Sequence, residues 1–376
     1  MAPASSQEDA RTQAGEVKHQ ALANHNDFAF LRAALFRQDS PLDTLKTAAA
    51  AKSVRVALGD TSLDAALSRV LSCPSQLVHR IGFLENLFTH QPHYEPLLNH
   101  FLRSLKNEMR RVLAAMGGRS TSTSCAIATD GLFETANGLI GHPLYRDLPR
   151  EWTFPVLNPT LDFAAIEQDY ASNAPGLTYF DSFLTKHATD ELLRFAQQSD
   201  VYFDDKPGYI GACPQHGFVH PALVQLVEEL RAAMPDRLKD YAVENIWSYK
   251  AMQDTPKALG LHADDADLNF NFWITDSSAN IDPSSGGLVV YQTVAPANWT
   301  FSQYNDVFEQ DSMRQYLLQS GATRVVIPFR QGRCVIFNSS LFHESDAHHF
   351  RPGYKHLRIN FTILFSRKQR MFDRLQ

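Results

Sequence analysis

Cysteine is scarce and scattered in this sequence, and its spacing excludes a disulfide-stabilised protein. The 376 residues contain four cysteines, far apart in the chain: Cys73, Cys125, Cys213 and Cys334. No two of them form a CxxC pair, and no disulfide framework can be read from them. Because such usage is typical of a reducing, intracellular environment, we predict a cytoplasmic protein.

Three further absences narrow the function. The formal net charge is -6, so the basic surface typical of nucleic-acid-binding proteins is missing. No apolar run is long enough to span a membrane, and Met1 to Ala14 lack the apolar core of a signal peptide. We therefore expect neither a nucleic-acid partner nor a membrane partner. The hydrophobic fraction of 44% and the aromatic fraction of 11% are those of a packed globular protein. The sequence does not indicate the oligomeric state.

The pattern of the sequence changes about halfway along the chain. Residues 1–20 are predicted to be a flexible polar lead-in. Between 21 and 150, apolar residues recur at helical spacing, as in His93 to Met116. This part is predicted to be an α-helical domain, either one of its own kind or a degenerate helical-repeat array without a fixed period. Several prolines in 151–175 predict a linker, and a β-rich domain is predicted over 176–376.

Two helices and a series of short strands are predicted in this C-terminal half. One helix starts over Thr185–Leu193, and a second spans Pro221–Met234. Later runs of strand-forming residues lie at 246–249, 269–275, 287–291, 325–328, 333–338 and 358–365. This order predicts an α+β protein in which a double-stranded β-helix (jelly-roll) domain follows the α-helical N-terminal domain.

His262 and Asp264 are the first candidates for chemistry. In an extended segment, residues two apart point to the same side. One imidazole and one carboxylate are two of the three ligands in the 2-His-1-carboxylate facial triad, which binds ferrous iron. The apolar strand 334–337 and a short polar turn then present a second histidine, His343. We predict that these three residues are catalytic metal ligands.

Other residues of the same types remain alternatives for two of these places. They are His348, His349 and His356 for the second imidazole, and Asp265 and Asp267 for the carboxylate. His348 and His349 lie in a polar loop and do not directly follow a strand and a turn. Asp265 would face away from His262 in an extended segment, and Asp267 lies further along.

The last predicted strand carries a polar row that suggests an acid-binding site. Arg358, Asn360 and Thr362 share one face, and the apolar residues between them share the other. An arginine inside a β-sandwich is costly unless it is paired. A dicarboxylate co-substrate would be such a partner, held by a charge-assisted and bidentate contact. Arg351 and Lys355, in the loop around Pro352, are the rival anchors.

Asn269 and Asn271 form a second polar pair, on a strand otherwise rich in aromatic residues. Their common face is either a solvated face of a sheet or a polar surface that contacts the co-substrate. Asn271 is therefore kept as a candidate co-substrate contact.

Four pieces of the sequence, in order, resemble the catalytic domain of the Fe(II)/2-oxoglutarate-dependent dioxygenases, in the branch similar to prolyl 4-hydroxylases. They are Tyr179–Leu184 followed by a helix, His262-Ala263-Asp264, Gly286–Tyr291, and His343 with Arg358 and Asn360. The resemblance covers about half of the chain, from 177 to 366. Many prolyl hydroxylases carry lysine at the anchor, and serine is usual where this chain has Asn360. The resemblance therefore supports the superfamily and leaves a prolyl substrate open.

The resemblance implies an iron-dependent oxidoreductase. Fe(II) would be held by His262, Asp264 and His343, with 2-oxoglutarate and O2 as co-substrates. Ascorbate is a candidate reductant. The expected contacts to 2-oxoglutarate are Arg358, Asn360, Tyr249 and Asn271. The expected reaction is hydroxylation of a C–H bond, with CO2 and succinate as co-products. Asp264 argues against halogenation, because related halogenases carry a small residue at that ligand position.

A small-molecule substrate is expected over a protein, and hydroxylation of a peptide or protein side chain, as in prolyl hydroxylases, is the alternative. The region Ala295–Thr323 is long enough to form a lid or a binding loop, with Asn298–Phe301 and Tyr304 as its aromatic part. Trp273 and Tyr291 are candidates to line the cavity.

A hypothesis of a different class is a binding or scaffold protein with a relic oxygenase domain. In that case the helical half would carry the function. The intact ligand triad and anchor favour the enzyme, because a relic is expected to lose ligands.

Overall fold

The structure is a computed structural model of the 376-residue chain. It describes residues 151–368 except 207, 215–216, 253–258 and 306–309, and also 79, 82–83, 86, 144–145 and 148–149. The lead-in predicted over 1–20 and nearly all of the helical domain predicted over 21–150 lie outside the described residues, so both stay predictions. Within the described part, no helix combines the length and the apolar character that a membrane crossing requires.

Four of the described helices precede strand β6 (Tyr241–Ala251). They are α9 (Phe163–Ser172), α10 (Lys186–Gln198), α11 (Pro221–Ala233) and α12 (Pro235–Leu238). Thr185 begins α10 as its N-cap, because its hydroxyl accepts a hydrogen bond from the Ala188 amide at 3.2 Å. Pro221 begins α11, where its fixed φ fits the first turn. Both helix starts agree with the sequence prediction.

The segment 151–175 is not a linker, as the sequence suggested, but part of the folded unit. It contains α9, and its residues Val156 and Leu157 are buried in the main apolar core. The prolines that suggested a linker flank the helix, at Pro159 and Pro175, and leave its interior free to form.

Seven strands form the main antiparallel sheet, in the order β2-β10-β7-β12-β6-β5-β4. Their bounds are β2 (Leu177–Phe180), β4 (Asp204–Lys206), β5 (Tyr209–Ala212), β6 (Tyr241–Ala251), β7 (Leu268–Trp273), β10 (Cys334–Asn338) and β12 (Ile359–Arg367). Every strand of this sheet except the outer β2 and β4 is paired on both edges, and β12 lies at the centre.

A smaller antiparallel sheet has the order β11-β8-β9, made of β11 (Leu341–Ser345), β8 (Leu288–Val294) and β9 (Arg324–Ile327). A single bridge between His262 and His343 adds the H-x-D segment to the edge of β11. The two antiparallel sheets agree with the predicted jelly-roll architecture. Two short strands, β1 (Leu144–Tyr145) and β3 (Ser199–Asp200), pair with each other in a separate antiparallel ladder.

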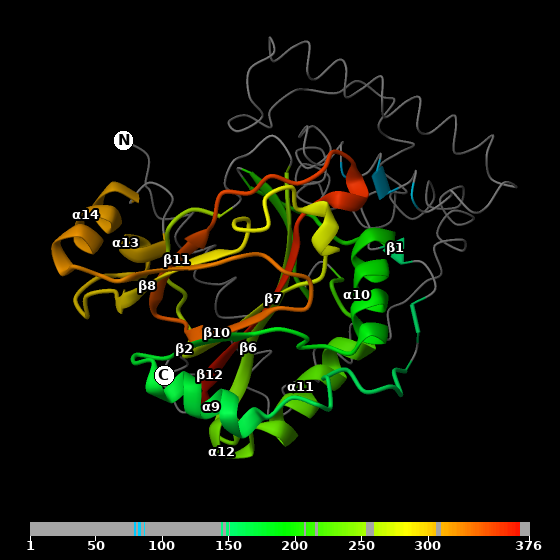
Figure 1. Cartoon of the computed structure of the whole chain (residues 1–376), viewed down its shortest axis with the longest axis horizontal. Helices are drawn as coiled ribbons and strands as arrows, with labels where there is room; N and C mark the ends of the chain where they lie inside the picture. The colour runs from blue at the N-terminus through cyan, green and yellow to red at the C-terminus, as the bar shows by residue number, and fades with distance from the viewer. Residues whose placement is uncertain are drawn as a thin grey trace, which may run out of the picture.

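Short helices occupy the remaining connections. Between β8 and β9 the chain forms α13 (Phe301–Asn305) and α14 (Gln310–Ser320), where the sequence predicted a lid or binding loop. Figure 1 shows these two helices beside β8 and β11, at the end of the molecule away from α10 and α11. Two 3-10 turns, Ser277–Ala279 and Tyr354–His356, complete the described elements.

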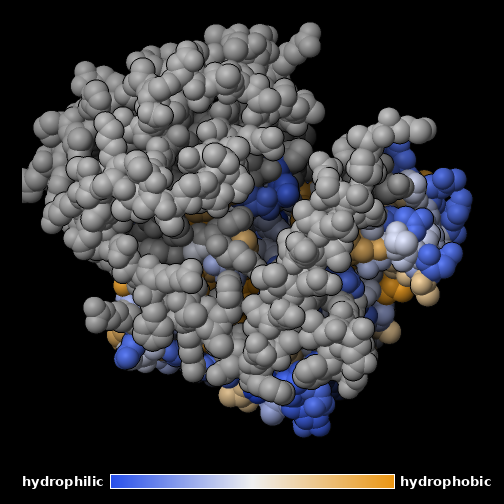
Figure 2. Space-filling model, turned by 180° about the vertical axis from the view of Figure 1, so that it is seen from behind, coloured by the Kyte–Doolittle hydropathy of each residue, from blue (hydrophilic) through white to orange (hydrophobic). Residues whose placement is uncertain are grey.

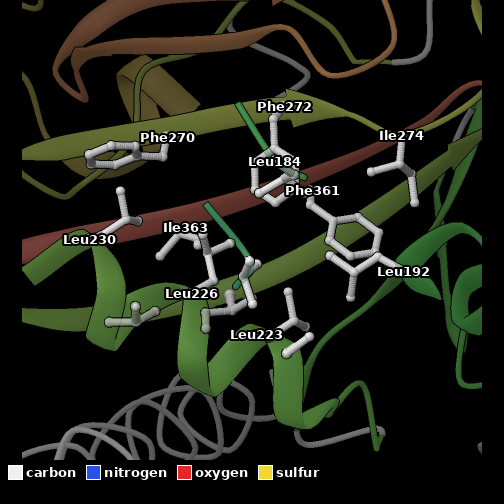
Figure 3. Packing of buried hydrophobic residues seen from close by; sticks show 14 of the residues in the cluster. Leu184, Leu192, Leu223, Leu226, Leu230, Phe270, Phe272, Ile274, Phe361 and Ile363 are labelled. Atoms are coloured by element: carbon white, nitrogen blue, oxygen red, sulfur yellow. The ribbon is translucent and has the colours of Figure 1, made fainter. Parts of the chain in front are cut away.

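The apolar core lies between the main sheet and the helices that cover it. Leu223, Leu226 and Leu230 of α11 point at the sheet, and Phe270, Phe272, Phe361 and Ile363 of β7 and β12 meet them (Figure 3). Because side chains alternate along a strand, the residues between these point to the opposite face, into the space between the two sheets. That opposite face carries the candidate site. Seen from behind, hydrophilic and hydrophobic residues mix along the visible rim of the described part (Figure 2).

Candidate metal centre and co-substrate cavity

Backbone pairing places the two predicted imidazole ligands side by side. The His262 amide donates to the His343 carbonyl at 3.0 Å, and the His343 amide donates back to the His262 carbonyl at 2.8 Å. Residues paired in this way project to the same face of the ladder. The centres of the two imidazole rings are accordingly 4.2 Å apart.

His343 follows strand β10 and a short turn, as the sequence predicted. It lies within a further strand, β11, which the sequence analysis did not predict. The turn is made by Ser339 and Ser340, and the chain resumes pairing with β8 at Leu341. A strand fixes the ligand more firmly than a turn, because its backbone is bonded to neighbours on both sides.

Both histidines turn the same ring nitrogen towards the site. Nδ1 of His262 lies 2.8 Å from the Gly260 carbonyl oxygen, and Nδ1 of His343 lies 2.9 Å from the Leu341 carbonyl oxygen. A carbonyl accepts only, so Nδ1 carries the proton in each ring and Nε2 keeps its lone pair. Burial lowers the pKa of His343 well below its usual value, with the neighbouring His262 adding to the effect, which favours the neutral ring that a metal requires.

Asp264 brings a carboxylate to these two lone pairs. Its Oδ1 lies 3.7 Å from Nε2 of His262, and its Oδ2 lies 3.5 Å from Nε2 of His343. Burial raises the pKa of Asp264, against the lowering effects of His262 and of the hydrogen bond that Asn269 Nδ2 donates to Oδ2 at 2.9 Å. A second-sphere donor of this kind orients a ligating carboxylate.

The three predicted ligands therefore meet at one point. One ligand atom from each of His262, Asp264 and His343 lies within 4.8 Å of the others, the single such group of this size in the part of the chain that the structure describes. Two nitrogen lone pairs and a buried carboxylate facing each other repel unless a cation lies between them. The set is the 2-His-1-carboxylate triad suited to a non-haem iron(II) ion with open coordination positions, so the residues fit the metal.

The rival ligands lie elsewhere. His348 is buried and its ring contacts Phe350, His349 is exposed, and Nδ1 of His356 is bonded to the Pro352 carbonyl. Of the rival carboxylates, Asp265 lines the cavity without joining the ligand group. Asp267 accepts a hydrogen bond from the Arg367 amide at 2.8 Å.

Arg358 is buried directly before β12, with 3% of its surface exposed, as the polar row predicted. Its guanidinium donates to the carbonyls of Gly286 at 2.6 Å and Gly287 at 2.9 Å, and to Asn360 Oδ1 at 3.4 Å. Arginine has five N–H groups, so one on each terminal nitrogen is left for another acceptor. No carboxylate of the described residues lies within 4.0 Å of it to form an ion pair.

Arg358 stays a cation in this setting. Burial lowers its pKa to about 10, partly offset by Asp346, which still leaves it charged at neutral pH. Its guanidinium carbon lies 5.7 Å above the Trp273 ring, a cation–π contact. The rival anchors Arg351 and Lys355 are exposed. A buried arginine with two free N–H groups fits the distal carboxylate of a dicarboxylate such as 2-oxoglutarate.

The triad and Arg358 line the same cavity, of about 450 Å³. The size is within the range of small-molecule sites, roughly 300 to 1,000 Å³. The lining residues come from β5, β6, β7 and β12 of the main sheet, from β8 and β11 of the smaller sheet, from the segment that carries His262 and Asp264, and from α13. The cavity thus opens between the two sheets, against the polar face of the central strands.

The remaining predicted co-substrate contacts all line this cavity. Asn360 Nδ2 and Asn271 Nδ2 both donate to Thr362 Oγ1, at 3.3 and 3.1 Å, which continues the polar row from Arg358. Tyr249 faces Asn360 across the ladder. Burial raises the pKa of Tyr249 well above its usual value, so its phenol remains an O–H donor. Their roles towards a ligand stay predictions.

Of the aromatic residues proposed for the cavity wall, neither Trp273 nor Tyr291 lines it. Trp273 is fully buried beneath Arg358, and Tyr291 packs against the α14 side, where its hydroxyl donates to Glu344 at 3.0 Å. Trp247 and Phe301 line the cavity instead. Phe301 belongs to the region that the sequence predicted as a lid. Trp247 was not predicted, although side-chain alternation along β6 places it on the same face as Tyr249.

No protein-family model matches this chain, and no curated protein matches its sequence. Similar solved structures include SnoN, a non-haem α-ketoglutarate-dependent epimerase from nogalamycin biosynthesis (12% identity, 55% of this chain and 84% of that chain, TM-score 0.40). Another is HygX from Streptomyces hygroscopicus with nickel, 2-oxoglutarate and hygromycin B bound (14%, 57% and 88%, 0.37). A third is a prolyl-4-hydroxylase from Pseudomonas putida (18%, 55% and 99%, 0.35).

SnoN has been solved with Fe3+ and α-ketoglutarate, and HygX with iron and, separately, with nickel and 2-oxoglutarate. Because their TM-scores are 0.40 and below, the fold and the site of this chain are inferred from its own strands and side chains, not from these structures.

Proposed function

We propose that this protein is an Fe(II)- and 2-oxoglutarate-dependent dioxygenase that hydroxylates a C–H bond of a small molecule, with CO2 and succinate as co-products. The observation that carries the proposal is the joint presence, in one cavity, of the metal triad and of a buried arginine with two free N–H groups. A scaffold without activity has no need to keep these buried polar groups, because each is costly without a ligand.

The chain's own residues have separable tasks in this function. His262, Asp264 and His343 would hold Fe(II), and Arg358 would hold the distal carboxylate of 2-oxoglutarate. When bound, iron and 2-oxoglutarate supply the oxygen activation. The protein orients the co-substrate along the row of Asn360 and Thr362, and the sheets on either side limit the access of water.

The cavity favours a polar small molecule as the substrate. Beyond Arg358 and the triad, its lining continues with amides, such as Asn245, with carboxylates, such as Glu244, and with the ring of Trp247. The lining also includes apolar side chains, such as Leu288, Phe301 and Leu364, so polar and apolar surface face the cavity in similar amounts. A volume of about 450 Å³ accommodates the co-substrate and a molecule of metabolite size.

The test is the turnover of the co-substrate. The full chain is incubated with Fe(II), ascorbate and 2-oxoglutarate in air, and succinate is measured with and without a panel of polar metabolites. We expect succinate above the background without substrate, and more of it with the right metabolite. His343→Ala should abolish the signal, and His349→Ala, at an exposed histidine, should leave it unchanged.

Two results would contradict the proposal. A wild-type chain that neither binds 2-oxoglutarate in the presence of Fe(II) nor forms succinate would favour the scaffold hypothesis. Full succinate formation by His343→Ala would show that the ligand assignment is wrong.

A further inference from the structure

The segment that carries His262 and Asp264 has two edges, and the second edge is covered by an unusual partner. His262 itself bonds to β11, but the peptide groups of its neighbour Leu261 point the other way. The Leu261 amide donates to Gln310 Oε1 at 2.9 Å, and Gln310 Nε2 donates to the Leu261 carbonyl at 2.5 Å. One side-chain amide thus gives the pair of hydrogen bonds that a neighbouring strand would give.

The residue on the other side of His262 is held in the same way. The Ala263 amide donates to the Tyr304 carbonyl at 2.8 Å, and Asn305 Nδ2 donates to the Ala263 carbonyl at 2.6 Å. All four backbone groups next to His262 are therefore bonded to α13 or to the first residue of α14. These groups are buried, and a buried peptide group without a partner is strongly disfavoured.

Apolar and charged contacts join the same two helices to the second ligand segment. Met313 and Leu317 of α14 are buried in a small cluster with Leu261, Ala263 and Phe342. Phe342 precedes His343, and Glu344 follows it. Arg314 donates to Glu344 Oε2 at 2.8 Å, although Glu344 is only 2% exposed. Both ligand-bearing segments thus rest on one insert, α13 and α14, which lies beside β8 and β11 (Figure 1).

We propose that Gln310 and Asn305 are positioning residues of the metal centre: they complete the second edge of the His262–Asp264 segment and fix the direction of both ligands. This inference rests on the proposed function, since it concerns the same metal. The insert also forms part of the cavity wall through Phe301 and Asn305. The element that fixes the ligands therefore also touches the contents of the cavity.

The experiment measures metal binding directly, with Co(II) as the probe. Co(II) is titrated into the full chain, and the dissociation constant and the visible ligand-field spectrum are recorded for each variant. Removing an outer-sphere partner typically weakens metal binding by about 10- to 100-fold. We expect Gln310→Ala to raise the dissociation constant by about 10-fold and to change the spectrum. Gln315→Ala, at an exposed glutamine of the same helix, should match the wild type.

Two near-isosteric variants keep the test decisive if Gln310→Ala does not fold. Gln310→Glu retains the acceptor for the Leu261 amide and loses the donor, so an intermediate affinity is expected. Asn305→Asp likewise loses its donor to Ala263 and should weaken Co(II) binding. Variants that bind Co(II) with the wild-type affinity and spectrum would overturn the inference, even if their melting temperatures fall. Failure of the wild type to bind Co(II) would instead overturn the proposed function.

Discussion

The two faces of the central strands β7 and β12 differ sharply, although each strand supplies alternate residues to both. The face towards the helices is apolar, and the face towards the cavity is polar. The helix side includes Phe270, Phe272, Phe361 and Ile363, and the cavity side includes Asn269, Asn271, Asn360 and Thr362. Apolar burial stabilises by about 25 cal/mol per Å², whereas a buried amide contributes little net stability even when it is bonded.

This difference separates residues that stabilise the fold from residues that serve a ligand. Arg358 is the extreme case on the polar face, since it is buried and has no carboxylate of the described residues within 4.0 Å. Keeping such a group lowers stability in exchange for function. Substitutions on the two faces should therefore have opposite signatures: a loss of stability on one, and a loss of ligand affinity on the other.

The largest effect is expected on the helix side, at Phe361. Its ring is fully buried and lies 5.1 Å from the Phe218 ring and 5.5 Å from the Phe272 ring. Phe361→Ala should lower the free energy of unfolding by about 3 to 5 kcal/mol, because it leaves a cavity in the core. Urea unfolding followed by circular dichroism measures this change. Below the transition, the affinity for 2-oxoglutarate should stay within about threefold of the wild type.

Phe154→Ala is the control for this prediction, because its ring is 54% exposed. It should cost no more than about 1 kcal/mol. Equal unfolding midpoints for Phe361→Ala and Phe154→Ala would contradict the assignment of the helix side as the stabilising face.

The next effect is expected at Arg358, with the opposite signature. Arg358→Met removes a charge-assisted, bidentate contact, which is worth about 2 to 3 kcal/mol, so the dissociation constant for 2-oxoglutarate should rise about 100-fold. The free energy of unfolding should change by less than about 1 kcal/mol, because the removal of a buried charge without a carboxylate partner offsets the loss of the hydrogen bonds to the Gly286 and Gly287 carbonyls. Calorimetric titration without oxygen measures the affinity, and urea unfolding measures the stability.

Arg351→Met is the matched control, at an exposed arginine that was the rival anchor. It should leave the affinity for 2-oxoglutarate within about twofold. If Arg351→Met weakened binding as much as Arg358→Met, the anchor would be assigned to the wrong residue.

A smaller effect concerns the helix layer itself, which holds a charge of its own at Glu191. Burial alone would raise the pKa of Glu191, but the Arg194 guanidinium and the His220 ring lower it to about 2. Since the folded chain favours the carboxylate, this stabilisation is present above about pH 4.5 and is lost as the pH falls towards 2. After allowance for solvent screening it is worth about 1 to 2 kcal/mol.

Glu191→Gln should therefore flatten the dependence of the melting temperature on pH between 4.5 and 2. Circular dichroism melts at half-unit steps check this, with Glu151→Gln, at an exposed glutamate, as the control that should follow the wild type. Burial also lowers the pKa of His220, so its protonation at acid pH acts in the same direction in both proteins. A wild-type slope in Glu191→Gln would rule out this ion pair as a source of acid sensitivity.

The contrast between an apolar and a polar strand face could be predicted from the sequence where apolar and polar residues alternate along one strand. The polar row of β12 from Arg358 to Thr362 predicted both the cavity side and the core side of that strand. The H-x-D triplet and His343 predicted three residues that the structure brings together, although they lie 79 positions apart between Asp264 and His343. In each case the side-chain period or the chemistry of a known ligand set carried the prediction.

Other features could not be predicted, because they depend on contacts between distant parts of the chain. The bonds from Gln310 to Leu261 join residues 49 positions apart and involve the backbone of one partner, which leaves no mark in its side chain. The prolines around α9 suggested a linker. Proline is common both in linkers and next to the ends of helices, so its presence alone does not distinguish the two. The strand β11 was not predicted, because its pairing with β8 is visible only in the folded protein.

The smallest effect is expected at Thr362, on the polar face. Its hydroxyl oxygen accepts hydrogen bonds from Asn271 and Asn360. Thr362→Val keeps the shape and removes this acceptor. In a dry interior, two unpaired amides would cost several kcal/mol, at about 1 to 3 kcal/mol each. In a cavity that admits water, the same amides rebond to solvent, and we expect a loss of less than about 1 kcal/mol in the free energy of unfolding.

Thr275→Val supplies the comparison, since the Thr275 hydroxyl donates to the Leu357 carbonyl at 2.7 Å and accepts from the Ile359 amide at 2.9 Å, away from the cavity lining. It should cost about 1 to 3 kcal/mol, because a buried peptide N–H and a buried carbonyl lose their partner. Urea unfolding of both variants measures the difference. If the cost at Thr362 were as large as that at Thr275, the polar face would be dry and would serve the fold. If the amides of this face serve a ligand and are hydrated without it, the cost at Thr362 is smaller, and the affinity for 2-oxoglutarate falls a few-fold.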